Sequence, residues 1–206
     1  MDIKLRFVNQ SSDGNKSEVV IYQKNLLNHM TSLAMAWKVI RFCGRDCFHP
    51  FVYPAGFEVC VADGYGNFSP RVAVGNGQSL KLQSTASGSR RLVRAGSASA
   101  SNEVDVLNDL DQGAVDVCIF RDGRMVGAKT TVTPGQKAVF QYPPVLWIGV
   151  ASQIVLGHAI SSAVMSSANT ELSLLGIASA DIVMSGGGPG EDSTPYEFNL
   201  DNIVQI

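Results

Sequence analysis

Charged side chains are scarce in this sequence. Asp, Glu, Lys and Arg make up 17% of its 206 residues, against about 25% in an average soluble protein. A net charge of −2 and a pI near 5.9 leave no broad positive surface, so general nucleic-acid binding is disfavoured. The hydrophobic content of 45% argues against disorder and indicates a folded chain in which small residues pack closely.

Cysteine and histidine are also sparse, with four and three residues respectively. The segment "CGRDCFH" brings Cys43, Cys47 and His49 close together in sequence, with His29 upstream. Zinc needs three or four such ligands in a tetrahedral arrangement, and no second paired motif supplies the rest. Unlinked thiols are therefore the leading interpretation, no metal site is expected, and a Cys43–Cys47 disulfide is the alternative.

Motifs that carry enzyme chemistry are missing. No G-x-S-x-G segment occurs, and no acid, base and nucleophile can be assigned to one site. The glycine-rich segments "DGYGNF" (63–68) and "GGGPGED" (186–192) precede no convincing helix, so they indicate turns rather than phosphate sites. We expect a non-enzymatic protein without catalytic residues or cofactors.

A secretory signal is not visible at the start of the sequence. Met1 to Lys4 lead directly into a strand-like pattern, with no basic region followed by an apolar one. We expect synthesis in the cytoplasm without a classical signal peptide, and release, if it occurs, by a non-classical route.

Short alternating strands dominate the pattern. "IKLRFVN" places Ile3, Leu5 and Phe7 on one face. Asn76-Gly77 is the strongest hairpin signal, and Asp122-Gly123 and Pro134-Gly135 supply further tight turns.

Further strands and loops are expected in the other segments. "LAMAWKVIRF" is expected as a strand, "CGRDCFHPFVYPAG" as a loop, and residues 181–206 as two strands around a glycine-rich turn. The prediction is an all-β, single-domain β-sandwich over residues 1–206, Greek-key or jelly-roll-like, built of short antiparallel strands with at most one short helix.

One stretch, from Ala138 to Thr170, contains no Asp, Glu, Lys or Arg. A transmembrane helix needs about 20 predominantly apolar residues, and Gln, Pro, His and Ser interrupt every such window here. A membrane β-hairpin fits better, because its strands need about 9–11 residues each and tolerate Ser and Gly on one face. Alternation from Ile154 to Met165 and a helical stripe from Val150 to Leu175 both describe this stretch.

The uncharged stretch has three possible environments: the core, a subunit interface or a membrane. For the last two, the expected segment consists of its larger apolar residues: Trp147, Ile148, Ile154, Leu156, Ile160, Val164 and Met165.

Aromatic residues gather in two expected loops. Amphipathic rings suit a membrane boundary or the face of a sugar. The candidate ligand or headgroup rim is Phe48, Phe51, Tyr53, Tyr65 and Phe68, and the alternative is that these rings close the end of the core. The basic cluster of Arg90, Arg91 and Arg94 is interpreted as a solvated hairpin edge, with an anion or headgroup site as the alternative.

An uncharged Ser/Ala/Gly-rich segment together with aromatic loops is similar, in composition, to β-rich pore-forming toxins. The leading functional hypothesis is a self-associating β-sandwich protein that acts on membranes, pore-forming or toxin-like. The alternatives are a structural or assembly subunit (shell, filament or inclusion) and a carbohydrate-binding module. The expected partners are further copies of the chain and a lipid membrane or glycan receptor, and not nucleic acid.

Overall fold

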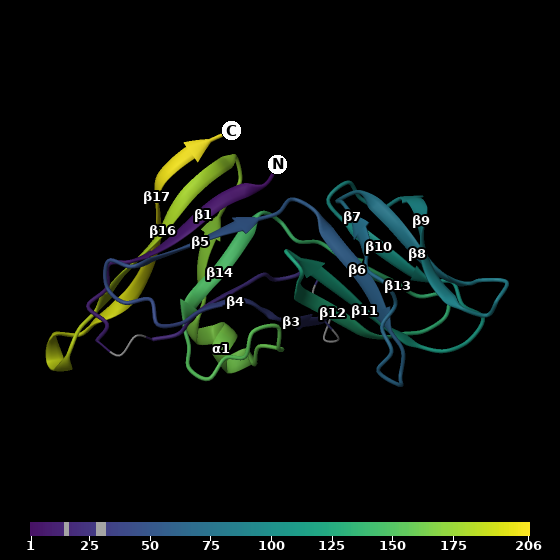
Figure 1. Cartoon of the computed structure of the whole chain (residues 1–206), viewed down its shortest axis with the longest axis horizontal. Helices are drawn as coiled ribbons and strands as arrows, with labels where there is room; N and C mark the ends of the chain where they lie inside the picture. Colours follow the sequence, from purple (N-terminus) through teal and green to yellow (C-terminus); the bar gives the residue numbers. More distant parts are fainter. Residues whose placement is uncertain (15–16, 28–31) are drawn as a thin grey trace. The chain divides into compact units, whose positions relative to one another are not determined.

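A computed structural model describes residues 1–14, 17–27 and 32–206 of the chain. The regular structure of these residues is almost entirely β-strand, with one short α-helix, α1 (Ser162–Ser167), and one 3-10 turn, η1 (Gly190–Asp192). The strands form sheets in which antiparallel pairs predominate. The prediction of an all-β, sandwich-like fold is therefore confirmed (Figure 1).

The chain forms two compact units. Unit 1 comprises Met1–Gln23, Met35–Ala55 and Pro144–Ile206, and unit 2 comprises Lys24–Ala34 and Gly56–Pro143. The single domain expected over residues 1–206 stays a prediction.

Unit 1 contains two four-stranded sheets. The order in the first sheet is β17 (Thr194–Gln205), β16 (Ile177–Gly187), β1 (Ile3–Asn9) and β5 (Phe48–Tyr53). The order in the second sheet is β15 (Thr170–Ser173), β14 (Val145–Val150), β2 (Val19–Tyr22) and β4 (Ala36–Ile40).

The core of unit 1 lies between these sheets. Trp37 of β4 packs edge-on against Phe51 and Tyr53 of β5, with ring centroids 6.0 and 5.8 Å apart. In β1 the predicted alternation holds, since Ile3, Leu5 and Phe7 are buried. Such inward rows of apolar side chains supply the main stabilisation of a sandwich.

Unit 2 pairs a four-stranded sheet with a five-stranded one. The first has the order β13 (Lys137–Phe140), β10 (Val104–Asn108), β8 (Gln78–Ser84) and β9 (Arg90–Ser97). The second has the order β3 (Ser32–Ala34), β12 (Arg124–Val132), β11 (Val115–Arg121), β6 (Phe57–Ala62) and β7 (Val72–Val74). The ring of Tyr142 links the two sheets, because it lies 6.4 Å from Phe140 of β13 and 5.9 Å from Phe57 of β6.

Of two hairpins predicted from turn residues, the structure contains one. Asp122 and Gly123 both have positive φ, 52° and 67°, and they join β11 and β12 as the expected hairpin. Asn76-Gly77 joins β7 and β8, which belong to different sheets, so the hairpin expected there is wrong. Gly77 has the left-handed φ of 78° that a tight turn requires, but burial selects the pairing partner of each strand.

The loop expected over "CGRDCFHPFVYPAG" is also only partly correct. Its second half forms β5, which pairs antiparallel with β1. Pro50 and Pro54 suggested a loop, but β5 is an edge strand, where proline is tolerated.

Candidate functional site

The uncharged stretch divides into a buried part and a surface part. Leu146 and Ile148 of β14 are fully buried in unit 1. After Val150 the chain leaves the sheet, runs irregularly to Ser161, forms α1 and returns to the sheet as β15. Neither the continuous alternation nor the helical stripe describes residues 151–161, which contain no regular element beyond an isolated bridge between Met35 and Ala159.

The predicted segment residues therefore lie in different environments. Ile148 and Ile160 belong to the core. Partly exposed positions are Trp147, Ile154, Val164 and Met165. Leu156 is exposed to 41%, and its neighbour Val155, which the sequence did not single out, to 54%. The uncharged surface is thus residues 151–167, which we call the surface segment.

An ion pair holds the start of the surface segment. The carboxylate of Glu18 accepts a hydrogen bond from Arg41 Nε at 2.8 Å and one from the backbone N–H of Ile154 at 3.3 Å. Arg41 Nη2 also donates to the carbonyl oxygen of Ile154. Neither Glu18 nor Arg41 was recognisable from sequence, because both lie more than a hundred residues from the segment that they bind.

Backbone contacts with β4 hold the middle of the surface segment. The N–H of Gly157 donates to the carbonyl of Ala36 at 2.8 Å, and the N–H of Ala36 donates to the carbonyl of His158 at 3.0 Å. These two bonds flank the bridge between Met35 and Ala159.

Tyr22 of β2 holds the end of the surface segment. Its hydroxyl donates to the carbonyl oxygens of Met165 at 3.2 Å and Ala168 at 2.9 Å. Burial raises the pKa of Tyr22 to about 12, so the hydroxyl remains a donor at neutral pH. Helix α1 buries none of its own residues, and Ser161 caps its first turn by accepting from the N–H of Val164.

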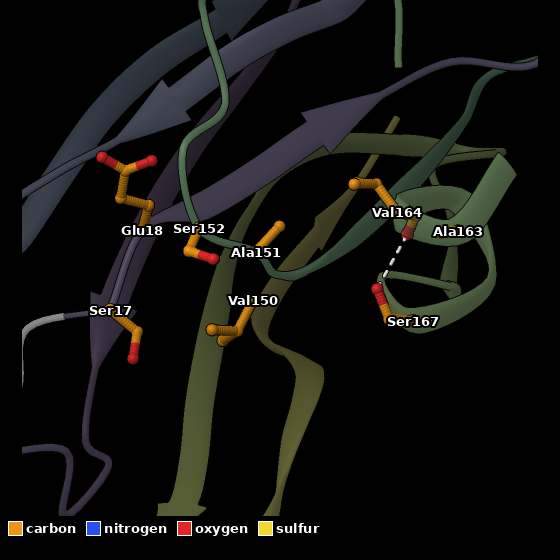
Figure 2. Close-up of a pocket in the computed structure, with 8 residues that line it drawn as sticks. All are labelled: Ser17, Glu18, Val150, Ala151, Ser152, Ala163, Val164 and Ser167. Atoms are coloured by element: carbon orange, nitrogen blue, oxygen red, sulfur yellow. Dashed lines mark hydrogen bonds between the residues drawn. The ribbon is translucent and has the colours of Figure 1, made fainter. Parts of the chain in front are cut away.

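A cavity of about 430 Å³ lies beneath the surface segment, between the start of β2, the end of β14 and α1 (Figure 2). The described lining residues are Ser17, Glu18, Val150, Ala151, Ser152, Ala163, Val164 and Ser167. The Ser167 hydroxyl donates to the carbonyl of Val164 at 3.1 Å, and the carboxylate of Glu18 already pairs with Arg41. No lining residue in the described part of the chain is a histidine, cysteine or lysine that could activate a serine. The cavity is therefore interpreted as space left under a loosely packed segment.

The five aromatic residues of the predicted rim also separate. Phe51 and Tyr53 are buried in the core of unit 1 against Trp37, as the alternative interpretation expected. Phe48 is exposed in unit 1, with the guanidinium of Arg6 5.6 Å from its ring centroid. Tyr65 and Phe68 are exposed in unit 2.

The cysteine-rich loop contains free thiols. Cys43 is half-buried and Cys47 is exposed. Burial, and then the neighbouring Cys47, raise the pKa of Cys43. Within residues 1–14, 17–27 and 32–206, no three His, Cys, Asp or Glu side chains group as metal ligands, and His29 lies outside the described residues.

Comparisons with known proteins give no match: no protein family, curated protein or solved structure corresponds to this chain. Among the described residues, no helix has the length and apolar character needed to cross a membrane.

Proposed function

We propose that this chain is a non-enzymatic, self-associating β-sandwich protein that acts on membranes, in a pore-forming or toxin-like manner, through the surface segment 151–167. The observation that carries the proposal is that residues 151–167 carry no Asp, Glu, Lys or Arg and, apart from Ile160, lie at least partly exposed. Sandwich residues before and after it are buried, so the segment can leave while the sandwich remains.

The exposed apolar side chains of the surface segment gain free energy in an apolar phase. Fully burying a Val or Leu side chain contributes about 1.5–3 kcal/mol. Because Val155 and Leu156 are about half exposed, their transfer gains about 1.5–3 kcal/mol together. Release breaks the Glu18–Arg41 pair, which is worth about 1 kcal/mol at most near the surface. It also breaks the hydrogen bonds to Tyr22 and Ala36, each worth about 0.5–1.5 kcal/mol, so a membrane must supply further contacts. Transfer also moves no Asp, Glu, Lys or Arg, each of which costs about 2.5–3.5 kcal/mol at the bilayer centre.

The length of the uncharged stretch also supports the proposal. Residues 147–156 and 158–167 carry no Asp, Glu, Lys or Arg on either side of Gly157. The second side has the 9–11 residues of a membrane-spanning strand, and the first side reaches that length only if the last four residues of β14 also leave the sheet. Gly157 already has a positive φ of 77°, as a residue in a tight turn between two such strands requires.

Dye release from liposomes tests the proposal. The wild-type chain is expected to release dye, and the double variant Val155→Asp/Leu156→Asp to need about tenfold more protein for the same release, since 1.4 kcal/mol corresponds to a factor of ten. Val52→Asp is the matched control, because Val52 is an exposed apolar residue of unit 1 outside the segment. Intact liposomes with wild-type protein across neutral and anionic lipid compositions would overturn the proposal.

A tether tests the role of the segment itself. Met35 and Ala159 lie opposite one another in an antiparallel bridge, which places their Cβ atoms at a separation suited to a disulfide. The variant Met35→Cys/Ala159→Cys is expected to release dye only after reduction, while each single variant releases dye with or without reductant. Dye release by the oxidised, cross-linked protein contradicts insertion of the segment.

An assembly subunit is the second candidate function, and β17 is the observation that favours it. This strand of twelve residues forms an edge of its sheet. Its last residues, including Ile203 and Val204, are exposed. Further apolar surface comes from Leu175 and from Ile206, whose N–H donates to the carbonyl of Gly176. A long apolar edge strand associates readily with a strand of another copy.

Light scattering without lipid distinguishes the two candidates. An assembly formed through β17 is expected to be large without lipid and to dissociate in the variant Ile203→Lys/Val204→Lys. It should persist in Val155→Asp/Leu156→Asp, which leaves β17 unchanged. A wild-type monomer at all concentrations removes the assembly function.

A further inference from the structure

Three connections of unit 2 form a hollowed surface. Residues 63–71 join β6 to β7, residues 85–89 join β8 to β9, and residues 109–114 join β10 to β11. Residues of these connections and of the first position of β9 line two hollows, of about 350 and 530 Å³. Both hollows are lined by Asp63 and Arg90, so they adjoin. Their sizes fall in the range of small-ligand sites.

Each hollow has an exposed aromatic ring. Tyr65 lines the larger hollow and is exposed to 93%, and Phe68 lines the smaller one and is exposed to 62%. Val61 and Val115, which are buried, add an apolar wall to the smaller hollow. An exposed ring beside an apolar wall offers a flat surface for the C–H face of a pyranose ring.

The turn that carries both rings is held by Asp63. Its Oδ1 accepts from the backbone N–H groups of Tyr65 at 2.9 Å and Asn67 at 3.0 Å, and its Oδ2 accepts from Asn67 Nδ2 at 3.0 Å. Hydrogen bonds from the side chain and backbone of Asn67 hold the pKa of Asp63 below its usual range. The carboxylate is therefore ionised at neutral pH, and Oδ2 keeps room for a further donor.

Two donors beside this turn make no hydrogen bond within the described part of the chain. The guanidinium of Arg90 attracts the carboxylate of Asp63 electrostatically but donates to no described residue, and it passes over Gly113, where a Cβ would lie 3.4 Å from Nη2. The side-chain amide of Gln112, which lines the larger hollow, is likewise unbonded among residues 1–14, 17–27 and 32–206.

The charges of the hollows favour an uncharged ligand. One carboxylate, Asp63, and one guanidinium, Arg90, line both hollows and leave no net charge. An anion would meet Asp63 and a cation would meet Arg90, whereas hydroxyl groups can donate to one and accept from the other.

We propose that these hollows bind a neutral saccharide. Its ring lies against Tyr65 or Phe68, and its hydroxyls bond to Arg90, Gln112 and Asp63 Oδ2. The inference goes beyond action on membranes, because it assigns a binding site to unit 2 and not to the surface segment of unit 1.

Titration of isotope-labelled full-length protein with neutral disaccharides (lactose, maltose, cellobiose and mannobiose), followed by NMR, tests this proposal. At least one sugar is expected to shift the amide signals of Tyr65, Phe68, Arg90 and Gly113. Tyr65→Ala and Arg90→Ala are each expected to weaken that binding about tenfold or more. Phe48→Ala, an exposed ring of unit 1, and Arg91→Ala, a neighbour in β9 that lines neither hollow, are the matched controls and should bind as wild type.

Three results would overturn the saccharide proposal. The first is no shift of these amide signals with any neutral sugar of the panel at 50 mM. The others are equal shifts with sialyllactose or inorganic phosphate, and loss of sugar binding in Phe48→Ala. Dye release from sugar-free liposomes does not involve the hollows, so failure of the saccharide site and failure of membrane action are read separately.

Discussion

Cys60 of β6 and Cys118 of β11 face each other directly across an antiparallel strand pair in unit 2, and both side chains are buried. A hydrogen bond with Cys60, and then burial, raise the pKa of Cys118, so its thiol stays protonated. Because both side chains are buried, these two thiols pack as small apolar side chains that reagents in solution do not reach.

The four cysteines should therefore differ in their rates of alkylation. With N-ethylmaleimide at neutral pH, Cys47 is expected to react first and Cys43 more slowly, because the pKa of Cys43 is raised. Cys60 and Cys118 should react only after unfolding. Intact mass and peptide mapping measure the order, with the protein in guanidinium chloride as the control for four adducts. Rapid labelling of Cys60 in the folded protein would contradict the buried pair.

Arg6 and Asp181 predict a stability that depends on pH. Arg6 donates twice to the carboxylate of Asp181, at 2.8 and 2.5 Å, and Asn202 Nδ2 adds a third bond at 2.7 Å. The bond from Arg6 is the main cause that holds the pKa of Asp181 below its usual value. A depressed pKa stabilises the fold above the unfolded value of about 3.9, and this stabilisation is lost as pH falls through the folded pKa.

Asp181→Asn is accordingly expected to lower the Tm by a few degrees at pH 7. Its Tm should begin to approach that of the wild type as the pH falls below about 4, and converge only below the depressed pKa of Asp181, where the native carboxyl becomes neutral. Thermal unfolding followed by circular dichroism measures both. Asp201→Asn on the neighbouring strand is the control, because Asp201 is exposed, and an equal loss in the control would argue against a specific role for Asp181.

No space is left for a larger side chain at Gly149, at the base of the surface segment. A Cβ at Gly149 would overlap the Cα and Cβ of Ala168, which follows α1. Gly149→Ala is expected to destabilise the protein by about 1–3 kcal/mol, as overpacking of a filled interior does. Urea unfolding gives the value. Gly44→Ala, whose new Cβ meets no atom within 4 Å, is the control and should be close to neutral.

Tyr22 predicts how firmly α1 is attached. Tyr22→Phe removes the donor to Met165 and Ala168 and keeps the ring in the core. We expect a loss of about 0.5–1.5 kcal/mol and faster hydrogen exchange confined to residues 161–168. Unchanged exchange there would mean that α1 is held by other contacts. If the segment enters membranes, the same variant should release dye at lower protein concentration than the wild type.

Features that depend on neighbouring residues were predictable from the sequence. The alternation of Ile3, Leu5 and Phe7, the Asp122-Gly123 hairpin, and the two C-terminal strands around a glycine-rich turn all follow from local periodicity and turn chemistry. So did the strand character of Leu33 to Ile40, which forms β3 and β4.

Features that depend on distant partners were not predictable. Asn76-Gly77 makes a tight turn, but nothing local tells that β7 pairs with β6 while β8 pairs with β9 and β10. Phe51 and Tyr53 were interpreted as loop aromatics, because the sequence does not show that their segment pairs with β1 and packs against Trp37. The hollows of unit 2 combine three connections, so no single segment of sequence contains Tyr65, Arg90 and Gln112 together.

The parallel pairing of β1 with β16 has a consequence for how the chain is made. β1 lies in the middle of its sheet, between β5 and β16, and the whole of Gly56–Pro143 is translated between these two neighbours. On the ribosome, the side of β1 that pairs with β16 therefore has no hydrogen-bonding partner until residue 184 has emerged. Gly56–Pro143 can fold before that point. During synthesis the unpaired edge of β1 is therefore open to pairing with a strand of another nascent chain.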